Sequence, residues 1–171
     1  MIRIKIENED CMPTKQHRWD AGWDLKSQNE TFDLAPGDKV KVDTGVAFEI
    51  PARFMGLIVP RSGLGSKYRV GLANTVGVID SEYRGNIFVN LVNDGSEIIT
   101  IEKLERFCQL VILPINVNNL RVVTKLSTTG RGDGGFGSTG KTDKLIEDTL
   151  PEFEDEETME LEEILEWTET S

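Results

Sequence analysis

Hydrophobic and polar residues alternate along several short stretches of this chain. Residues 2–7 ("IRIKIE") alternate strictly, and residues 31–51 contain two more alternating runs on either side of Pro36-Gly37, a turn dipeptide. A short apolar run follows at residues 56–60 ("GLIVP"). Alternation with a period of two is typical of half-buried strands, so each run predicts a β-strand.

The same pattern continues through the second half of the chain. Residues 74–80 and 85–94 flank "SEYR" and predict a β-hairpin, while residues 106–115 and 120–125 ("LRVVTK") predict further strands. Only residues 62–69 ("SGLGSKYR") suggest a short helical turn. Short strands spaced by Gly, Pro, Asn and Asp predict an all-β fold, which is a sandwich, a barrel or a jelly roll.

The composition changes after Gly140. Residues 1–140 contain 17 basic and 17 acidic residues, whereas residues 141–171 contain two lysines and 13 acids. The net charge of -11 therefore lies in the C-terminal segment alone. We expect one domain over 1–140 and an acidic extension over 141–171 that is disordered or partly helical, around 155–168. No basic face is evident, so direct nucleic-acid binding is not expected.

Other features limit the class of protein. The sequence has no run of 18 apolar residues, so no membrane span is expected, and its start, "MIRIKIENED", is not a signal peptide. Cys11 and Cys108 are interpreted as reduced thiols in a cytoplasmic protein, with a single disulfide as the alternative. His17 is the only histidine, which excludes a catalytic triad and a histidine-based metal site.

Five stretches combine glycine with charged or hydroxyl side chains. Taken alone, each has an ordinary explanation as a turn or a flexible linker. They are "DAGWDLKS" (20–27), "PRSGLGSK" (60–67), "NTVGVIDSEYRGN" (74–86), "RFCQLVI" (106–112) and "GRGDGGFGSTG" (130–140).

Taken together, the side chains of these stretches suit a polyphosphate. Arg61 and Arg131 are planar donors for phosphate oxygens, and successive glycines let backbone N–H groups converge on an anion. Ser62, Ser138 and Thr139 add hydroxyl donors.

Three further residues suggest a nucleotide and its chemistry. Phe136 can cover a base, and Asp24 can hold Mg²⁺ through water, as carboxylates commonly do beside phosphates. Asp80 remains as a general base. The implied ligand is a nucleoside polyphosphate.

The five stretches, in this order and spacing, resemble the five motifs of the trimeric dUTPase family over roughly residues 20–140. The resemblance implies a jelly-roll β-barrel assembled as a homotrimer, with three active sites at subunit interfaces. It implies hydrolysis of dUTP to dUMP and pyrophosphate with Mg²⁺, which limits uracil in DNA and supplies a dTTP precursor.

The resemblance also implies a role for individual residues. Asp80 matches the carboxylate that activates the attacking water, and Asp24 matches the one that holds metal-bound water. The matches for base and sugar are Asn74, Gly77, Ile79, Tyr83, whose ring packs on deoxyribose, and Phe136. The matches for phosphate are Arg61, Ser62, Gly63, Gln109, Arg131, Gly137, Ser138 and Thr139. The glycine-rich residues 130–140 would close over bound nucleotide as a lid.

Two other functions remain open at this point. A dCTP deaminase shares the fold, but it would need a different base-reading segment and an acid for attack on the pyrimidine ring. A regulatory protein could use the same scaffold to bind a protein partner through the acidic residues 141–171. The chain is expected in the cytoplasm of a cell or of a virus-infected host.

Overall fold

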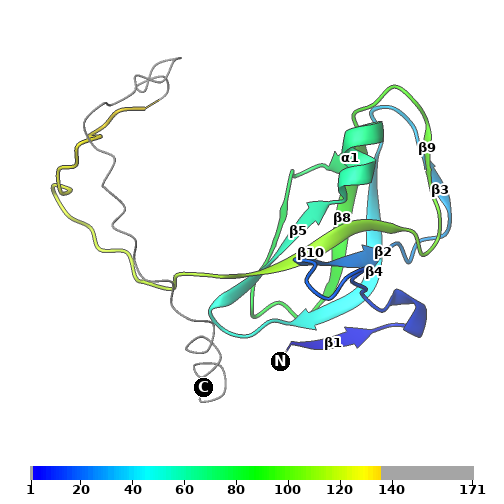
Figure 1. The fold of residues 1–171 in the computed structure, drawn as a ribbon, viewed down its shortest axis with the longest axis horizontal. Helices are drawn as coiled ribbons and strands as arrows, with labels where there is room; N and C mark the ends of the chain where they lie inside the picture. Colours follow the sequence, from blue (N-terminus) through cyan, green and yellow to red (C-terminus); the bar gives the residue numbers. More distant parts are fainter. Residues whose placement is uncertain (1, 136–171) are drawn as a thin grey trace, which may run out of the picture. The chain divides into compact units, whose positions relative to one another are not determined.

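The computed structural model describes residues 2–135, and residues 2–120 of these belong to one compact unit (Figure 1). Within the described residues, no helix is long and apolar enough to cross a membrane. The elements of this unit are β1 (Arg3–Ile6), the 3-10 helix η1 (Glu9–Cys11), β2 (Gly22–Lys26), β3 (Phe32–Leu34), β4 (Lys39–Glu49), β5 (Phe54–Pro60), α1 (Ser62–Tyr68), β6 (Val70–Leu72), β7 (Gly77–Ile79), β8 (Asn86–Asn93), β9 (Ile99–Ile101) and β10 (Arg106–Pro114).

The strands form two four-stranded antiparallel sheets and a two-stranded ribbon. One sheet has the order β1-β4-β8-β6, the other β2-β10-β5-β7, and β3 pairs with β9 (Figure 1). The strands predicted at residues 2–7, 31–51, 56–60 and 106–115 are all present. The predicted helical turn is α1, so the all-β expectation and its one helical exception are confirmed.

The core lies between the two sheets. On β8, Ile87, Val89 and Leu91 are buried while Phe88 and Asn90 between them are exposed, because successive side chains of a strand point to opposite faces. The facing sheet contributes Leu25, Ile58, Phe107 and Leu110. Full burial of each such side chain stabilises the fold by ~1.5–3 kcal/mol. The result is the predicted jelly-roll arrangement.

The hairpin predicted around "SEYR" is wrong. β7 pairs with β5, whereas β8 pairs with β4 and β6, so the two strands belong to different sheets. Alternation identifies a strand but not its partner, and the connection from Asp80 to Gly85 is long enough to cross from one sheet to the other. Asp80 and Tyr83 therefore lie on an inter-sheet connection.

The strand predicted at residues 120–125 is also wrong, since the structure contains no strand between 115 and 135. Leu120 and Val122 are 100% and 98% exposed. An alternating sequence becomes a strand only when another strand satisfies its backbone groups.

Both cysteines are free and buried, which agrees with the interpretation as reduced thiols rather than a disulfide. Cys108 lies on β10, as predicted, and Cys11 ends η1. Burial raises the pKa of both thiols, which keeps them protonated and unreactive at neutral pH.

Candidate active site

Asp24 lies at the centre of a polar cluster on the sheet that contains β2 and β10. Its Oδ1 is 3.4 Å from Nε of Arg61, its Oδ2 is 3.1 Å from Nη1 of Arg106, and its side chain is 17% exposed. Arg61 Nη1 also donates to the Arg106 carbonyl at 2.8 Å. Gln109 is the register partner of Asp24. The stretches 20–27, 60–67 and 106–112 therefore meet here. The last of them contributes Arg106 as well as Gln109.

A β-bulge explains why Arg106 can reach Asp24. Arg106 and Gln109 are three residues apart, so in a regular strand their side chains would point to opposite faces. The β2–β10 register shifts between Arg106 and Cys108, and the consecutive residues Phe107 and Cys108 are both buried. The bulge adds one residue to β10 between Arg106 and Gln109. Arg106 therefore lies on the same face of the sheet as Asp24 and Gln109.

Gly22 makes room for Gln109. A Cβ at position 22 would lie 2.6 Å from Gln109 Oε1 and 3.3 Å from the Leu110 carbonyl oxygen. The glycine of "DAGWDL" therefore allows the Gln109 amide to lie across β2, two residues from Asp24.

We expect Gly22→Ala to weaken nucleotide binding by displacing the Gln109 amide. A hydrogen bond to a charged group contributes about 1.5–3 kcal/mol, so KM should rise roughly 10-fold or more with a smaller change in kcat. Steady-state kinetics measure both constants. Gly71→Ala is the matched control, because a Cβ on this β6 glycine meets nothing within 4 Å. Equal effects of the two changes would contradict the role given to Gly22.

Ser62 and Gly63 begin α1, directly after Arg61. Both are exposed, and a Cβ at position 63 would meet nothing within 4 Å. Packing inside the chain therefore does not require glycine at this position. The absence of a side chain leaves the backbone accessible from outside.

Asp80 and Tyr83 share a turn whose backbone is closed by hydrogen bonds. The Tyr83 N–H donates to the Asp80 carbonyl at 3.1 Å, and Arg84 Nη1 donates to the carbonyls of Ser81 and Tyr83 at 2.6 and 2.9 Å. The Asp80 side chain is exposed and Tyr83 is 42% exposed. The turn thus presents a carboxylate and an aromatic ring to the surface.

The residues predicted to read the base lie before this turn. Asn74 is exposed in a tight turn in which the Thr75 N–H donates to the Leu72 carbonyl at 2.9 Å. Gly77 and Ile79 are the first and last residues of β7.

The two groups of polar residues lie at opposite corners of one sheet. Asp24 pairs with Gln109 and Gln109 with Val59, whereas Ile79, the residue before Asp80, pairs with Gly56. Three strand spacings and about four residues therefore separate the two carboxylates, which is roughly 14 Å across and 13 Å along the sheet. One chain alone does not bring Asp80 and Asp24 together.

Within the second unit, Arg131 forms a local turn. Its Nε donates to the Gly134 carbonyl at 3.1 Å, and the Gly134 N–H donates to the Arg131 carbonyl at 3.1 Å. Gly132 has a φ of 55°, a conformation that favours glycine. Phe136, Gly137, Ser138 and Thr139, and the extension 141–171, lie outside the described residues.

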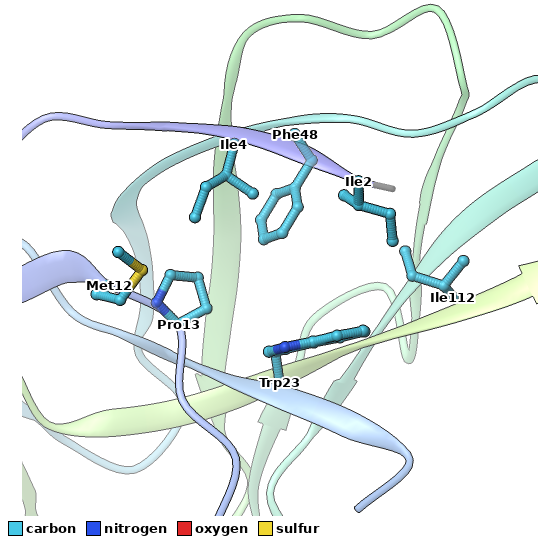
Figure 2. Close-up of a pocket in the computed structure, with 7 residues that line it drawn as sticks. All are labelled: Ile2, Ile4, Met12, Pro13, Trp23, Phe48 and Ile112. Carbon is cyan, nitrogen blue, oxygen red and sulfur yellow. The ribbon is translucent and has the colours of Figure 1, made fainter. Parts of the chain in front are cut away.

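An apolar cavity of about 190 Å³ is lined by none of the polar residues described above. Figure 2 shows the Trp23 indole on one side of the cavity and Phe48, Ile4 and Ile2 on the other. Asp24 follows Trp23 on β2 and points to the other face of the strand. Among the described residues, no arginine, lysine or hydroxyl lines the cavity, so it does not suit a triphosphate. Its lining is Ile2, Ile4, Met12, Pro13, Trp23, Phe48 and Ile112.

The donor set fits a metal ion that is bound together with phosphates. In the described residues, no group of three His, Cys, Asp or Glu side chains is placed to hold a metal ion. Asp24 offers one partly exposed carboxylate, already balanced by Arg61 and Arg106. Mg²⁺ is commonly held by one or two carboxylates and substrate phosphates, with water completing its shell.

Comparison with known proteins decides the family. The family model for dUTPase matches residues 8–140. The chain belongs to the dUTPase family. The deoxyuridine 5'-triphosphate nucleotidohydrolase of Escherichia phage T5 is 50% identical to this dUTPase-family chain over 147 residues, which cover 82% of this chain and 99% of the phage protein.

Solved structures agree. The dUTPase of Staphylococcus bacteriophage 80alpha with dUpNHpp is 34% identical, with a TM-score of 0.74, over 82% of this chain and 98% of that one. A mutant dUTPase of phage phi11 of S. aureus, whose structure reveals details of the coordination of a structural Mg(II) ion, is 30% identical, with a TM-score of 0.66, over 73% of this chain and 97% of that one.

Arg106 is the polar residue that sequence reasoning left without a role. The stretch "RFCQLVI" placed it on a strand with Gln109, but an odd spacing argues against a shared face. Two adjacent apolar residues, Phe107 and Cys108, interrupt the alternation and are the signal from which the bulge could have been inferred.

Proposed function

We propose that this protein hydrolyses dUTP to dUMP and pyrophosphate. The observation that carries the proposal is the cluster of Asp24, Arg61 and Arg106 beside Gln109, which joins a carboxylate to two guanidinium groups on one accessible face. Guanidinium groups suit phosphate oxygens, and the family match supplies the nucleotide. In this dUTPase-family chain, Arg61, Ser62, Gly63 and Gln109 would bind the phosphates.

The chemical step uses the exposed carboxylate of Asp80. Asp80 takes a proton from a water molecule while the water oxygen bonds to the α-phosphorus, and the bond from that phosphorus to the bridging oxygen breaks. Pyrophosphate leaves and dUMP remains. Mg²⁺, held through water by Asp24, would supply positive charge to the phosphate oxygens.

The base and the sugar would be read on the other side of the site. The backbone of Asn74, Gly77 and Ile79 would bind uracil, and the Tyr83 ring would lie against C2′ of the deoxyribose. A ribose hydroxyl or a thymine methyl would then meet protein atoms, which gives discrimination by shape.

Complete sites would require several copies of the chain. Asp80 and Asp24 lie at opposite corners of one sheet, so a site that uses both must take them from different subunits. We propose a homotrimer with three shared sites, as the family resemblance implies.

The direct test compares dUTP, dTTP, dCTP and UTP at equal concentrations with Mg²⁺. Pyrophosphate release from dUTP alone supports the proposal. Ammonia release from dCTP would instead identify a deaminase, and no reaction with any of the four would leave the scaffold as a binding protein.

Truncation after Thr129 is expected to leave a folded protein with weak dUTP binding and poor turnover. Residues 130–140 contain Arg131, Phe136, Ser138 and Thr139, whose contacts would form mainly when the segment closes over the nucleotide. Phe136→Ala should have a milder effect. Steady-state kinetics of both variants, beside truncation after Gly140 as the control, measure this. Full activity of the chain that ends at Thr129 would show that residues 130–140 are only a linker.

We also propose that residues 141–171 bind a protein partner. They carry the entire net charge of -11 and follow directly on the family match, which ends at residue 140. The phage 80alpha dUTPase is itself described as controlling the transfer of virulence genes, a role besides hydrolysis. Deleting 141–171 should leave dUTP turnover within a few-fold of the full chain and abolish capture of the partner. A strong loss of turnover would instead join this segment to catalysis.

A further inference from the structure

The Tyr83 ring is held by Gly85, the residue before β8, and by Asn86, the first residue of β8. Its hydroxyl donates to the Asn86 carbonyl at 2.8 Å. The ring also covers Gly85 so closely that a Cβ there would lie 2.5 Å from the hydroxyl oxygen and 2.8 Å from Cζ. The position of the ring therefore depends on where the backbone of residues 85 and 86 lies.

The backbone at Asn86 is fixed in turn by the Asn86 side chain. Asn86 Nδ2 donates to Glu7 Oε1 at 2.5 Å and lies 3.4 and 3.5 Å from the two carboxylate oxygens of Asp43. The second oxygen of Glu7 accepts a hydrogen bond from Gln28 Nε2 at 2.7 Å. The bonds from Gln28 and then Asn86 lower the pKa of Glu7, which keeps it ionised and able to accept.

A bulge in β4 brings these side chains together. Asp43 pairs with Phe88 and Ala47 with Asn86, so β4 has two more residues than β8 over this interval. Gly45 lies in the bulge with a φ of 65°, its N–H donates to Asp43 Oδ1 at 2.8 Å, and its carbonyl accepts from the Glu7 N–H at 2.9 Å. The bulge thus places two carboxylates, from the end of β1 and from β4, around one amide.

We propose that Glu7 and Asn86 are positioning residues for sugar discrimination: their hydrogen bond fixes the carbonyl that holds the Tyr83 ring against C2′ of the substrate. The inference rests on the proposed function of Tyr83 and extends it to Glu7, the residue that follows β1. In this role Glu7 and Asn86 would act without touching the nucleotide. Their effect reaches it through the Tyr83 hydroxyl.

The test is the ratio of kcat/KM for dUTP to kcat/KM for UTP. Asn86→Asp keeps the shape of the side chain but replaces the donor with a third carboxylate facing Glu7 and Asp43. We expect the ratio to fall about three- to tenfold, mainly through faster UTP turnover. Asn90→Asp is the matched control, since Asn90 lies on the same strand with an exposed side chain. Its ratio should stay within twofold of the unmodified chain.

A double-mutant cycle separates positioning from general stability. Tyr83→Phe removes the hydroxyl bond to Asn86, so it should lower the ratio by itself, and Asn86→Asp should then add little. Glu7→Gln provides a second, milder variant if Asn86→Asp folds poorly. If Asn86→Asp lowers both kcat/KM values equally and leaves their ratio unchanged, the inference is overturned but the proposed function is not. An unmodified chain that does not hydrolyse dUTP would overturn the proposed function as well.

Discussion

Asp80→Asn is expected to abolish most dUTP hydrolysis while leaving the fold and nucleotide binding in place. The amide has the same shape as the carboxylate but does not accept a proton from water, and loss of a general base costs about 10²–10⁴-fold. The exposed position of Asp80 on the inter-sheet connection means that no core contact is lost. Turnover of dUTP and binding of dUpNHpp, measured on the same preparation, give the two quantities.

Glu82→Gln is the control for this change. Glu82 is an exposed acid in the same turn, so the variant removes the same charge two residues away without removing the proposed base. Turnover by Asp80→Asn near that of Glu82→Gln would show that another group activates the water.

Mixing two inactive variants is expected to restore activity. Asp80→Asn chains still supply Asp24, and Asp24→Asn chains still supply Asp80, so sites shared between subunits can receive both carboxylates. In a cyclic trimer that contains both variants, about one of the three two-chain sites is intact. Co-expression with two different affinity tags, followed by purification on both, isolates the mixed oligomers for the assay.

The outcome for a site within one chain is different. In that case every site carries one of the two substitutions, and mixed oligomers stay as inactive as either parent. Simple mixing of the two purified variants, without exchange of subunits, provides the baseline.

The sequence was sufficient to predict most strands and three polar stretches that the fold brings together. The alternating runs at residues 2–7 and 31–51 correspond to β1, β3 and β4. Buried side chains lie on β3 and β4, whereas β1 is an edge strand whose residues are exposed or half-buried. Motif order identified Asp24, Arg61 and Gln109, and the fold brings their stretches together.

The remaining errors concern how strands are paired. The pattern around "SEYR" is the same whether the two strands pair with each other or with different sheets, so the inter-sheet crossing was not visible. The alternation at residues 120–125 is typical of a strand, but within the described part of one chain this segment pairs with no other strand. Arg106 was missed for a related reason, since its reach to Asp24 depends on a bulge in the pairing of β10 with β2.

In the proposed shared site, the placement of Asp24 and Asp80 at opposite corners of one sheet would make activity depend on the concentration of subunits. A chain that has just folded would be inert, and its activity would appear only when the subunit concentration exceeds the dissociation constant of the assembly. On dilution, the specific activity should therefore fall more steeply than the amount of protein. Any ligand that binds across two subunits would hold the assembly together, so dUTP would protect the enzyme that consumes it.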